Sequence, residues 1–164
     1  MAFSVTIATR QLDKPILQSL TSTGVATAVH EPGYTVTSDD GRVFKYVCFD
    51  SSDVAAVAGA PCVIAQTTAD DTYVVTADVS DGSLVAEGAF LSVLTDTYYG
   101  WIQTKGFMKD APVTNGAGAD VGADDPLGAT VDSMWTTVTV GGTTSTKAIA
   151  PEASASGIGN IVLL

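Results

Sequence analysis

Glycine and proline recur at short intervals along this chain, and that spacing constrains its fold more than any other feature. The 164 residues include 16 glycines and 6 prolines, and the segments between them are short and rich in valine and threonine. β-Branched residues suit a pleated, half-buried strand, whereas glycine and proline favour turns. The pattern therefore predicts an all-β fold in which many short strands are joined by turns.

The strand-like segments extend almost to the C-terminus, with no long helix between them, and predict a sandwich or barrel-like domain of about nine short strands. Their spacing is too uneven for a solenoid repeat. A turn is predicted at residues 39–41, because aspartate tolerates the left-handed region and glycine adopts it freely. The segments are 42–49, 63–66, 73–79, 89–94, 98–104, 111–114, 119–121, 135–140, 147–150 and 160–164, together with the short stretch 126–128.

The first 30 residues differ from the rest of the sequence. Apolar residues recur there at near-helical spacing, and Pro15 suits the first turn of a helix. We expect a mostly irregular N-terminal arm over residues 1–30, with one short helix, and a β-rich domain over residues 31–164. Such an arm can remain partly disordered until it meets a partner. The repeating apolar residues are Leu12, Ile16, Leu17 and Leu20.

The charge balance excludes several classes of partner. Seven basic residues face 18 acidic ones, giving a formal net charge of −11. An acidic chain lacks the lysine and arginine that neutralise nucleic-acid phosphates or anionic lipid headgroups. No apolar run is long enough to span a membrane, and the N-terminus lacks a secretory pattern. We expect a protein made in the cytoplasm, with neither nucleic acid nor membrane as its partner.

The residues that most often catalyse reactions or bind metals are sparse. The single histidine, His30, lies in the poorly patterned arm, where we expect it at the surface or partly packed. Cys48 and Cys62 match no metal or redox spacing, and we expect two buried thiols, not a disulfide. The sequence therefore predicts no enzymatic activity, no cofactor and no metal site.

Acidic residues leave one alternative open. The aspartate pairs at 39–40, 70–71 and 124–125 lie where turns are expected and do not fit a calcium loop, so we interpret them as solvated turn residues. Two carboxylates from distant strands can still meet as in a glycosidase. The few glutamates that such a hydrolase would use are Glu31, Glu87 and Glu152.

An aromatic cluster at residues 98–101 is the densest local signal. Side chains alternate along a strand, so Tyr99 and Trp101 should share one face, while Tyr98 and Gly100 share the other. We expect Tyr98, Tyr99 and Trp101 to be core or interface anchors, because large rings bury much apolar surface. An exposed platform that stacks on sugars is the alternative.

Three stretches carry a further signal. The first is DGRVFKYV at residues 40–47, followed by an Ala/Gly-rich segment to Cys62. The second is GAFL at 88–91, leading to YYGWIQTKG at 98–106. The third runs from APV at 111–113 through VGAD at 121–124 to AIAPEAS at 148–154 and the apolar C-terminus. Together they resemble the capsid cement, or head decoration, proteins of tailed bacteriophages.

The resemblance implies a non-enzymatic virion protein. Members of that family are β-rich, bind as trimers to the outside of an expanded capsid, and stabilise it. We therefore expect a homotrimeric subunit on the outer capsid surface that bridges neighbouring major capsid proteins. Leu12, Ile16, Leu17 and Leu20 of the arm are expected to contact a neighbour, as are Tyr98, Tyr99 and Trp101. The alternatives are a carbohydrate-binding module, or a head-fibre or tail module, that uses an exposed aromatic cluster.

Overall fold

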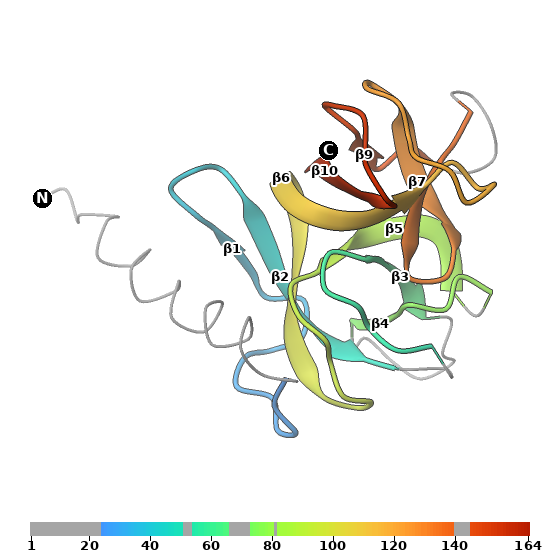
Figure 1. Cartoon of the computed structure of the whole chain (residues 1–164). Coiled ribbons are helices and arrows are strands. Elements are labelled where there is room, and N and C mark those ends of the chain that lie inside the picture. Colours follow the sequence, from blue (N-terminus) through green and yellow to red (C-terminus); the bar gives the residue numbers. More distant parts are fainter. Residues whose placement is uncertain (1–23, 51–53, 66–72, 81, 140–144) are drawn as a thin grey trace, which may run out of the picture.

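The computed structural model describes residues 24–50, 54–65, 73–80, 82–139 and 145–164. Within these residues the protein is all-β, as predicted, with ten strands and no helix (Figure 1). Among them, no helix therefore has the length and apolarity that crossing a bilayer requires. The strands are β1 (Thr35–Thr37), β2 (Val43–Phe49), β3 (Pro61–Ala65), β4 (Val74–Thr76), β5 (Gly82–Phe90), β6 (Tyr99–Thr114), β7 (Pro126–Val131), β8 (Met134–Thr137), β9 (Ala148–Ile149) and β10 (Ile158–Leu163).

The strands form one sheet that closes on itself twice. Their order is β1-β2-β4-β3-β5-β6-β10-β9-β7-β8, and two additional pairings join β2 to β6 and β6 to β8. The first ring therefore contains β2, β4, β3, β5 and the N-terminal half of β6. The second ring contains the C-terminal half of β6 with β10, β9, β7 and β8. Figure 1 shows the long, curved β6 passing from one ring into the other.

Both rings have the same topology. In each, the first and third strands in chain order pair in parallel, through Phe49 and Val75 in the first ring and through Val113 and Trp135 in the second. The other four pairings of each ring are antiparallel and join equivalent strands in the same circular order. The second ring thus repeats the first, although the uneven spacing of the sequence does not reveal the repeat.

Backbone details support this equivalence. Gly59 and Asp124 each lie two residues before the proline that begins the second strand of their ring, and both have left-handed φ angles, of 79° and 64°. The N–H of Gly59 donates to the carbonyl of Phe90 (2.8 Å), and that of Asp124 donates to the carbonyl of Ala150 (2.7 Å). The two connections therefore use the same turn with different residues.

Each ring encloses its own apolar core, and a third cluster lies on an outer face. The first ring's core draws on all five of its strands and includes Phe49, Phe90 and Ile102. The second ring's core surrounds the fully buried Trp135 and also receives side chains from β3 and β5. The third cluster consists of Val36, Phe44, Tyr46 and Trp101, from β1, β2 and β6.

Several predicted boundaries are wrong for identifiable reasons. The segments 98–104 and 111–114 are parts of one strand, β6. Gly106 has a φ of 95°, and this left-handed conformation lets the strand bend and continue. Residues 119–121 form no strand: the Asn115 side chain accepts from the N–H of Ala119, and the N–H of Val121 donates to Ser154 Oγ. Of the predicted segment 89–94, only residues 89 and 90 are in a strand, where they end β5, which spans 82–90.

The turn predicted at residues 39–41 is confirmed. Gly41 has a φ of 83°, and its N–H donates to the carbonyl of Ser38 (3.0 Å). The hairpin formed by β1 and β2 follows from this turn, with Thr37 opposite Val43. The turn also fixes the position of Asp40 and Arg42, whose side chains reappear in the site described below.

Candidate functional site

Tyr99 and Trp101 lie on one face of β6, as the strand alternation predicts. Their neighbours on β2 are Cys48 and Tyr46, respectively. Tyr46 and Trp101 pack edge to face with centroids 5.2 Å apart, and Tyr46 and Tyr99 stack at 6.1 Å. This face lies outside the first ring, because the Ile102 side chain belongs to the ring's core.

His30 completes this arrangement from outside the sheet. Its ring stacks on Tyr34 with centroids 5.3 Å apart, and it meets Tyr46 and Trp101 at 5.3 and 5.5 Å with steep interplanar angles. His30 is half-buried, so the expectation of a partly packed histidine is confirmed. We call His30, Tyr34, Tyr46, Tyr99 and Trp101 the aromatic cluster.

Backbone hydrogen bonds fasten residues 24–34 over the aromatic cluster. Val25 exchanges two bonds with Tyr99 (3.0 and 2.9 Å), and the N–H of Gly33 donates to the carbonyl of Tyr46 (2.7 Å). The Tyr46 hydroxyl accepts from the N–H of Val29 (3.3 Å). Burial raises the pKa of Tyr46, so its hydroxyl stays neutral over a wide pH range. Residues 24–30 of the expected arm therefore lie on the first ring.

Because residues 24–34 lie over β2 and β6, they bury part of the surface that the sequence predicted to be an interface. Trp101 is 2% exposed and Tyr46 is 1% exposed, so these two rings are packed and offer no open face to a sugar, whereas Tyr34 at the edge of the cluster is 42% exposed. Tyr98 and Tyr99 are half-buried. The other predicted interface residues, Leu12, Ile16, Leu17 and Leu20, lie outside the described residues.

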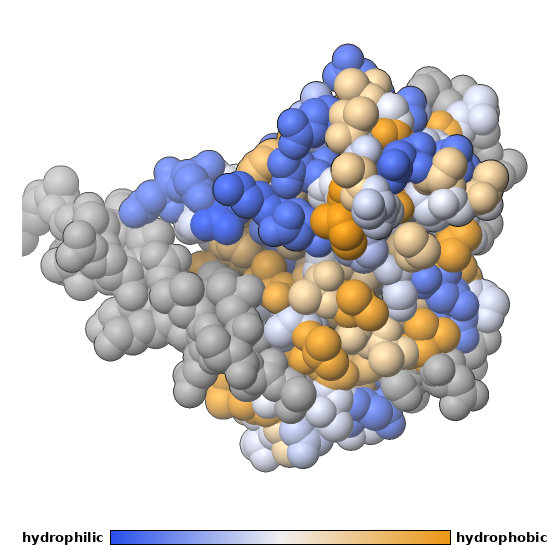
Figure 2. Space-filling view, in the orientation of Figure 1, coloured by the Kyte–Doolittle hydropathy of each residue, from blue (hydrophilic) through white to orange (hydrophobic). Residues whose placement is uncertain are grey.

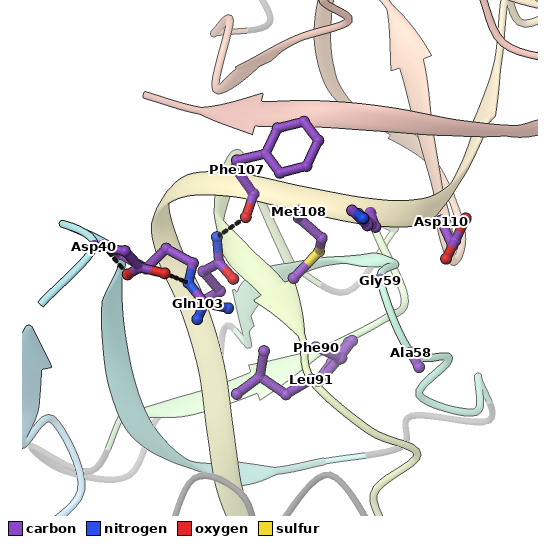
Figure 3. A pocket seen from close by; sticks show the side chains of 11 residues that line it. Asp40, Ala58, Gly59, Phe90, Leu91, Gln103, Phe107, Met108 and Asp110 are labelled. Atoms are coloured by element: carbon purple, nitrogen blue, oxygen red, sulfur yellow. Dashed lines mark hydrogen bonds and ion pairs between the residues drawn. The ribbon is translucent and has the colours of Figure 1, made fainter. Parts of the chain in front are cut away.

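A hollow of about 560 Å³ lies where the two rings meet (Figure 3). Its apolar walls include Phe90 and Leu91 from the end of the first ring's β5 and Phe107 and Met108 from the second ring's part of β6. Phe107 is 43% exposed, so part of its ring is accessible to a bound group. No signal in the sequence pointed to this hollow, because its walls come from segments far apart in the chain.

Gln103 shapes one wall of the hollow. Its side chain is 1% exposed, and its Nε2 donates to the carbonyl of Lys105 (3.2 Å) and to that of Phe107 (3.1 Å), as Figure 3 shows for Phe107. These two bonds span the left-handed Gly106, where β6 turns from one ring into the other. A buried amide whose donors are used in this way holds the bend in one conformation.

Charged side chains flank the hollow on two sides. On one side, Arg42 Nε contacts Asp40 Oδ2 at 2.7 Å. The hydroxyl of Ser38 donates to Asp40 and lowers the pKa of that carboxyl. On the other side lie Lys109 and Asp110. The Asp40–Arg42 pair is well exposed, so it contributes charge and shape more than stability.

The cysteines are free thiols, as predicted. Cys62 is fully buried and Cys48 is half-buried, so only Cys62 fits the expectation of a buried residue. Burial raises the pKa of both thiols, and for Cys48 the nearby charges of Asp50 and Asp96 raise it further. Neither thiol is therefore poised as a thiolate nucleophile.

The acidic residues belong to separate local structures. Asp39 and Asp40 lie in the β1–β2 turn, and Asp125 Oδ2 accepts from the N–H of Gly122 (2.7 Å). The pair at 70–71 lies outside the described residues. Glu87 forms an ion pair with Lys45, while Glu152 accepts from Asn160 Nδ2 (2.5 Å). In the part of the chain that the structure describes, no three His, Cys, Asp or Glu side chains gather to hold a metal.

No protein-family model matches the chain, and no curated protein matches it.

Proposed function

We propose that this protein is a capsid cement subunit of a tailed phage, which binds the outside of the head and bridges neighbouring major capsid proteins. The observation that carries the proposal is the fastening of residues 24–34 to the first ring. Gly24, where the described chain begins, is held beside Tyr98 and Tyr99. Residues 1–23, with their repeating apolar side chains, are therefore tethered to a fixed point on a compact body.

The arm (residues 1–23) and the body (residues 24–164) have net charges of opposite sign, which supports different roles for them. Residues 1–23 hold two of the seven basic residues and one of the 18 acidic ones, so their net charge is +1 and that of residues 24–164 is −12. A strongly acidic body stays soluble at the high copy number that assembly requires. It also avoids nonspecific contact with the packaged nucleic acid.

Adhesion of this kind stabilises a shell through many small contacts. Burying apolar surface contributes about 25 cal/mol per Å², so a modest contact repeated over a lattice adds a large total stabilisation. The described part of the chain offers exposed apolar side chains for such contacts, among them Val57, Val93 and Phe107. The three stretches that resemble cement proteins include parts of both rings.

Binding to purified phage particles tests the proposal. Expanded heads that lack this protein would be mixed with it and pelleted, and tails would be pelleted in parallel, because a tail module would bind tails instead. We expect saturable binding to heads and a higher temperature for head disruption. Leu17→Asp should weaken the binding, whereas Ile158→Asp, an exposed change on β10, should not. Heads that bind no wild-type protein would refute the proposal.

A further inference from the structure

We propose that the hollow between the two rings receives residues 12–20 from the N-terminal arm of a second copy of this chain. The occupant is the apolar stripe formed by Leu12, Ile16, Leu17 and Leu20. This inference rests on the proposed function in one respect. The cement proposal expects the arm to contact a neighbouring subunit, and here that neighbour is a second copy of this chain.

The hollow suits an apolar side-chain stripe. Its volume of about 560 Å³ lies within the range of roughly 300–1,000 Å³ that is usual for sites that bury a bound group. Leu91, Phe107 and Met108 give it apolar walls, with the fully buried Phe90 behind them (Figure 3). Figure 2 shows apolar patches among paler residues in the middle of the molecule, beside a hydrophilic strip near the β1–β2 turn.

Charge complementarity favours the arm as the occupant. The stripe is accompanied by Arg10 and Lys14, and Asp13 is the single acidic residue of residues 1–23. The body that would receive it has a net charge of −12, whereas the charges lining the hollow balance, with Asp40 and Asp110 beside Arg42 and Lys109. An arm of net charge +1 is therefore attracted to this body, whereas two bodies repel each other.

The length of the chain favours a second copy as the source of the whole stripe, because the Leu20 end of the stripe is tethered close to Gly24. Leu20 is four residues from Gly24, so it can lie at most about 14 Å from that residue. Gly24 is held beside Tyr99, and the stretch of β6 from there to Lys105 alone spans about 20 Å, with Phe107 beyond it.

The surface between these two points is already covered. His30 and Tyr34 of the same chain pack over Trp101, with centroids 5.5 and 6.2 Å from its ring. Leu20 could enter the hollow of its own chain only if residues 20–24 were fully extended across this covered surface. A second copy is not tethered at that point and can place the whole stripe in the hollow.

Disulfide trapping between two differently tagged copies tests the inference without phage heads. One copy has Leu20→Cys and the other Phe107→Cys, both in a Cys48→Ser background that removes the half-exposed native thiol. Mild oxidation of the mixture should give a heterodimer on a nonreducing gel. The matched control replaces Phe107→Cys with Ile158→Cys, which is similarly exposed but does not line the hollow. An equal yield in the control, or no cross-link at all, would overturn the inference.

Sedimentation gives a second measurement that does not depend on cysteines. The wild-type protein should sediment as an oligomer, and Phe107→Asp or Leu17→Asp should convert it to a monomer, whereas Ile158→Asp should not. Circular dichroism checks that each variant is folded. A monomeric wild-type protein overturns the inference even if it binds heads. An oligomer that cross-links through the hollow but binds no heads retains the inference and refutes the cement function.

Discussion

The side-chain amide of Gln103 donates to the main-chain carbonyl of Phe107, four residues further along the same strand, at 3.1 Å. A second bond from the same nitrogen reaches the carbonyl of Lys105 (3.2 Å). Between these carbonyls lies Gly106, with a φ of 95°. A single buried side chain thus fixes the bend at which β6 leaves one ring and enters the other.

Replacing Gln103 by leucine should therefore destabilise the protein. Leucine keeps the approximate size of the side chain but removes both hydrogen bonds, and a typical hydrogen bond contributes about 0.5–1.5 kcal/mol. Urea unfolding of Gln103→Leu measures the loss. Thr104→Val, which removes a longer hydroxyl bond to Val43 (3.3 Å), is the control and should cost less. Equal stability of Gln103→Leu and the wild-type protein would show that the amide does not hold the bend.

A Cβ at Gly100 should displace the buried side chain of Leu94. A Cβ built at Gly100 would lie 2.5 Å from Leu94 Cδ2, so Gly100→Ala should cost about 1–3 kcal/mol through overpacking. Leu94→Ala removes the clash, and in that background Gly100→Ala should be neutral or stabilising. A double-mutant cycle of unfolding free energies measures this coupling. Additive effects of the two substitutions would contradict the close approach.

His30→Ala should loosen the cover over the aromatic cluster. The loss of its ring contacts should cost about 0.5–1.5 kcal/mol and expose Trp101 to water. The Trp101 emission should shift to longer wavelength, while Trp135, which is fully buried in the second ring, stays unchanged. Val29→Ala, at an exposed neighbouring side chain, is the control. Identical emission spectra of His30→Ala and the wild-type protein would argue against the packing.

Exchanging residues between the equivalent turns should have opposite effects. Asp124→Gly should be neutral or stabilising, because glycine adopts a φ of 64° freely, whereas aspartate, which tolerates this region better than most residues, still incurs a small penalty. Gly59→Asp should destabilise, because its Cβ would lie 3.0 Å from the Cα of Ala111 in addition to that penalty. Melting temperatures of the two variants compare them. A destabilised Asp124→Gly would show that the two turns differ in their requirements.

Cys62 should make the stability of the protein fall at high pH. Burial raises the pKa of its thiol above the ordinary value of about 8.5, so the folded state favours the neutral thiol. That contribution is complete below the ordinary pKa and is lost as the pH rises above it, because the unfolded chain ionises first.

The stability difference between the wild-type protein and Cys62→Ala should therefore shrink between about pH 8 and pH 10. Urea midpoints measured under reducing conditions give this difference, and comparison of the two proteins cancels other titrating groups such as Tyr46. A pH-independent difference would mean that the thiol ionises as easily in the folded protein as in the unfolded one.

The sequence by itself determined the local properties of this protein. Glycine and proline spacing indicated an all-β fold, because these residues limit strand length wherever they occur. The turn at Gly41 and the shared face of Tyr99 and Trp101 followed from backbone conformation and strand alternation. Free thiols were also expected, since Cys48 and Cys62 fit no known spacing.

Only the tertiary structure decided how the strands close into two rings. Closure depends on pairings between residues distant in sequence, such as Cys48 with Val74, and no local pattern encodes which distant strands will meet. For the same reason, the sequence did not show that His30 packs over Trp101 or that a hollow lies between Leu91 and Phe107. Short-range preferences fix the conformation of each segment, whereas side-chain packing among remote segments fixes where the segments lie.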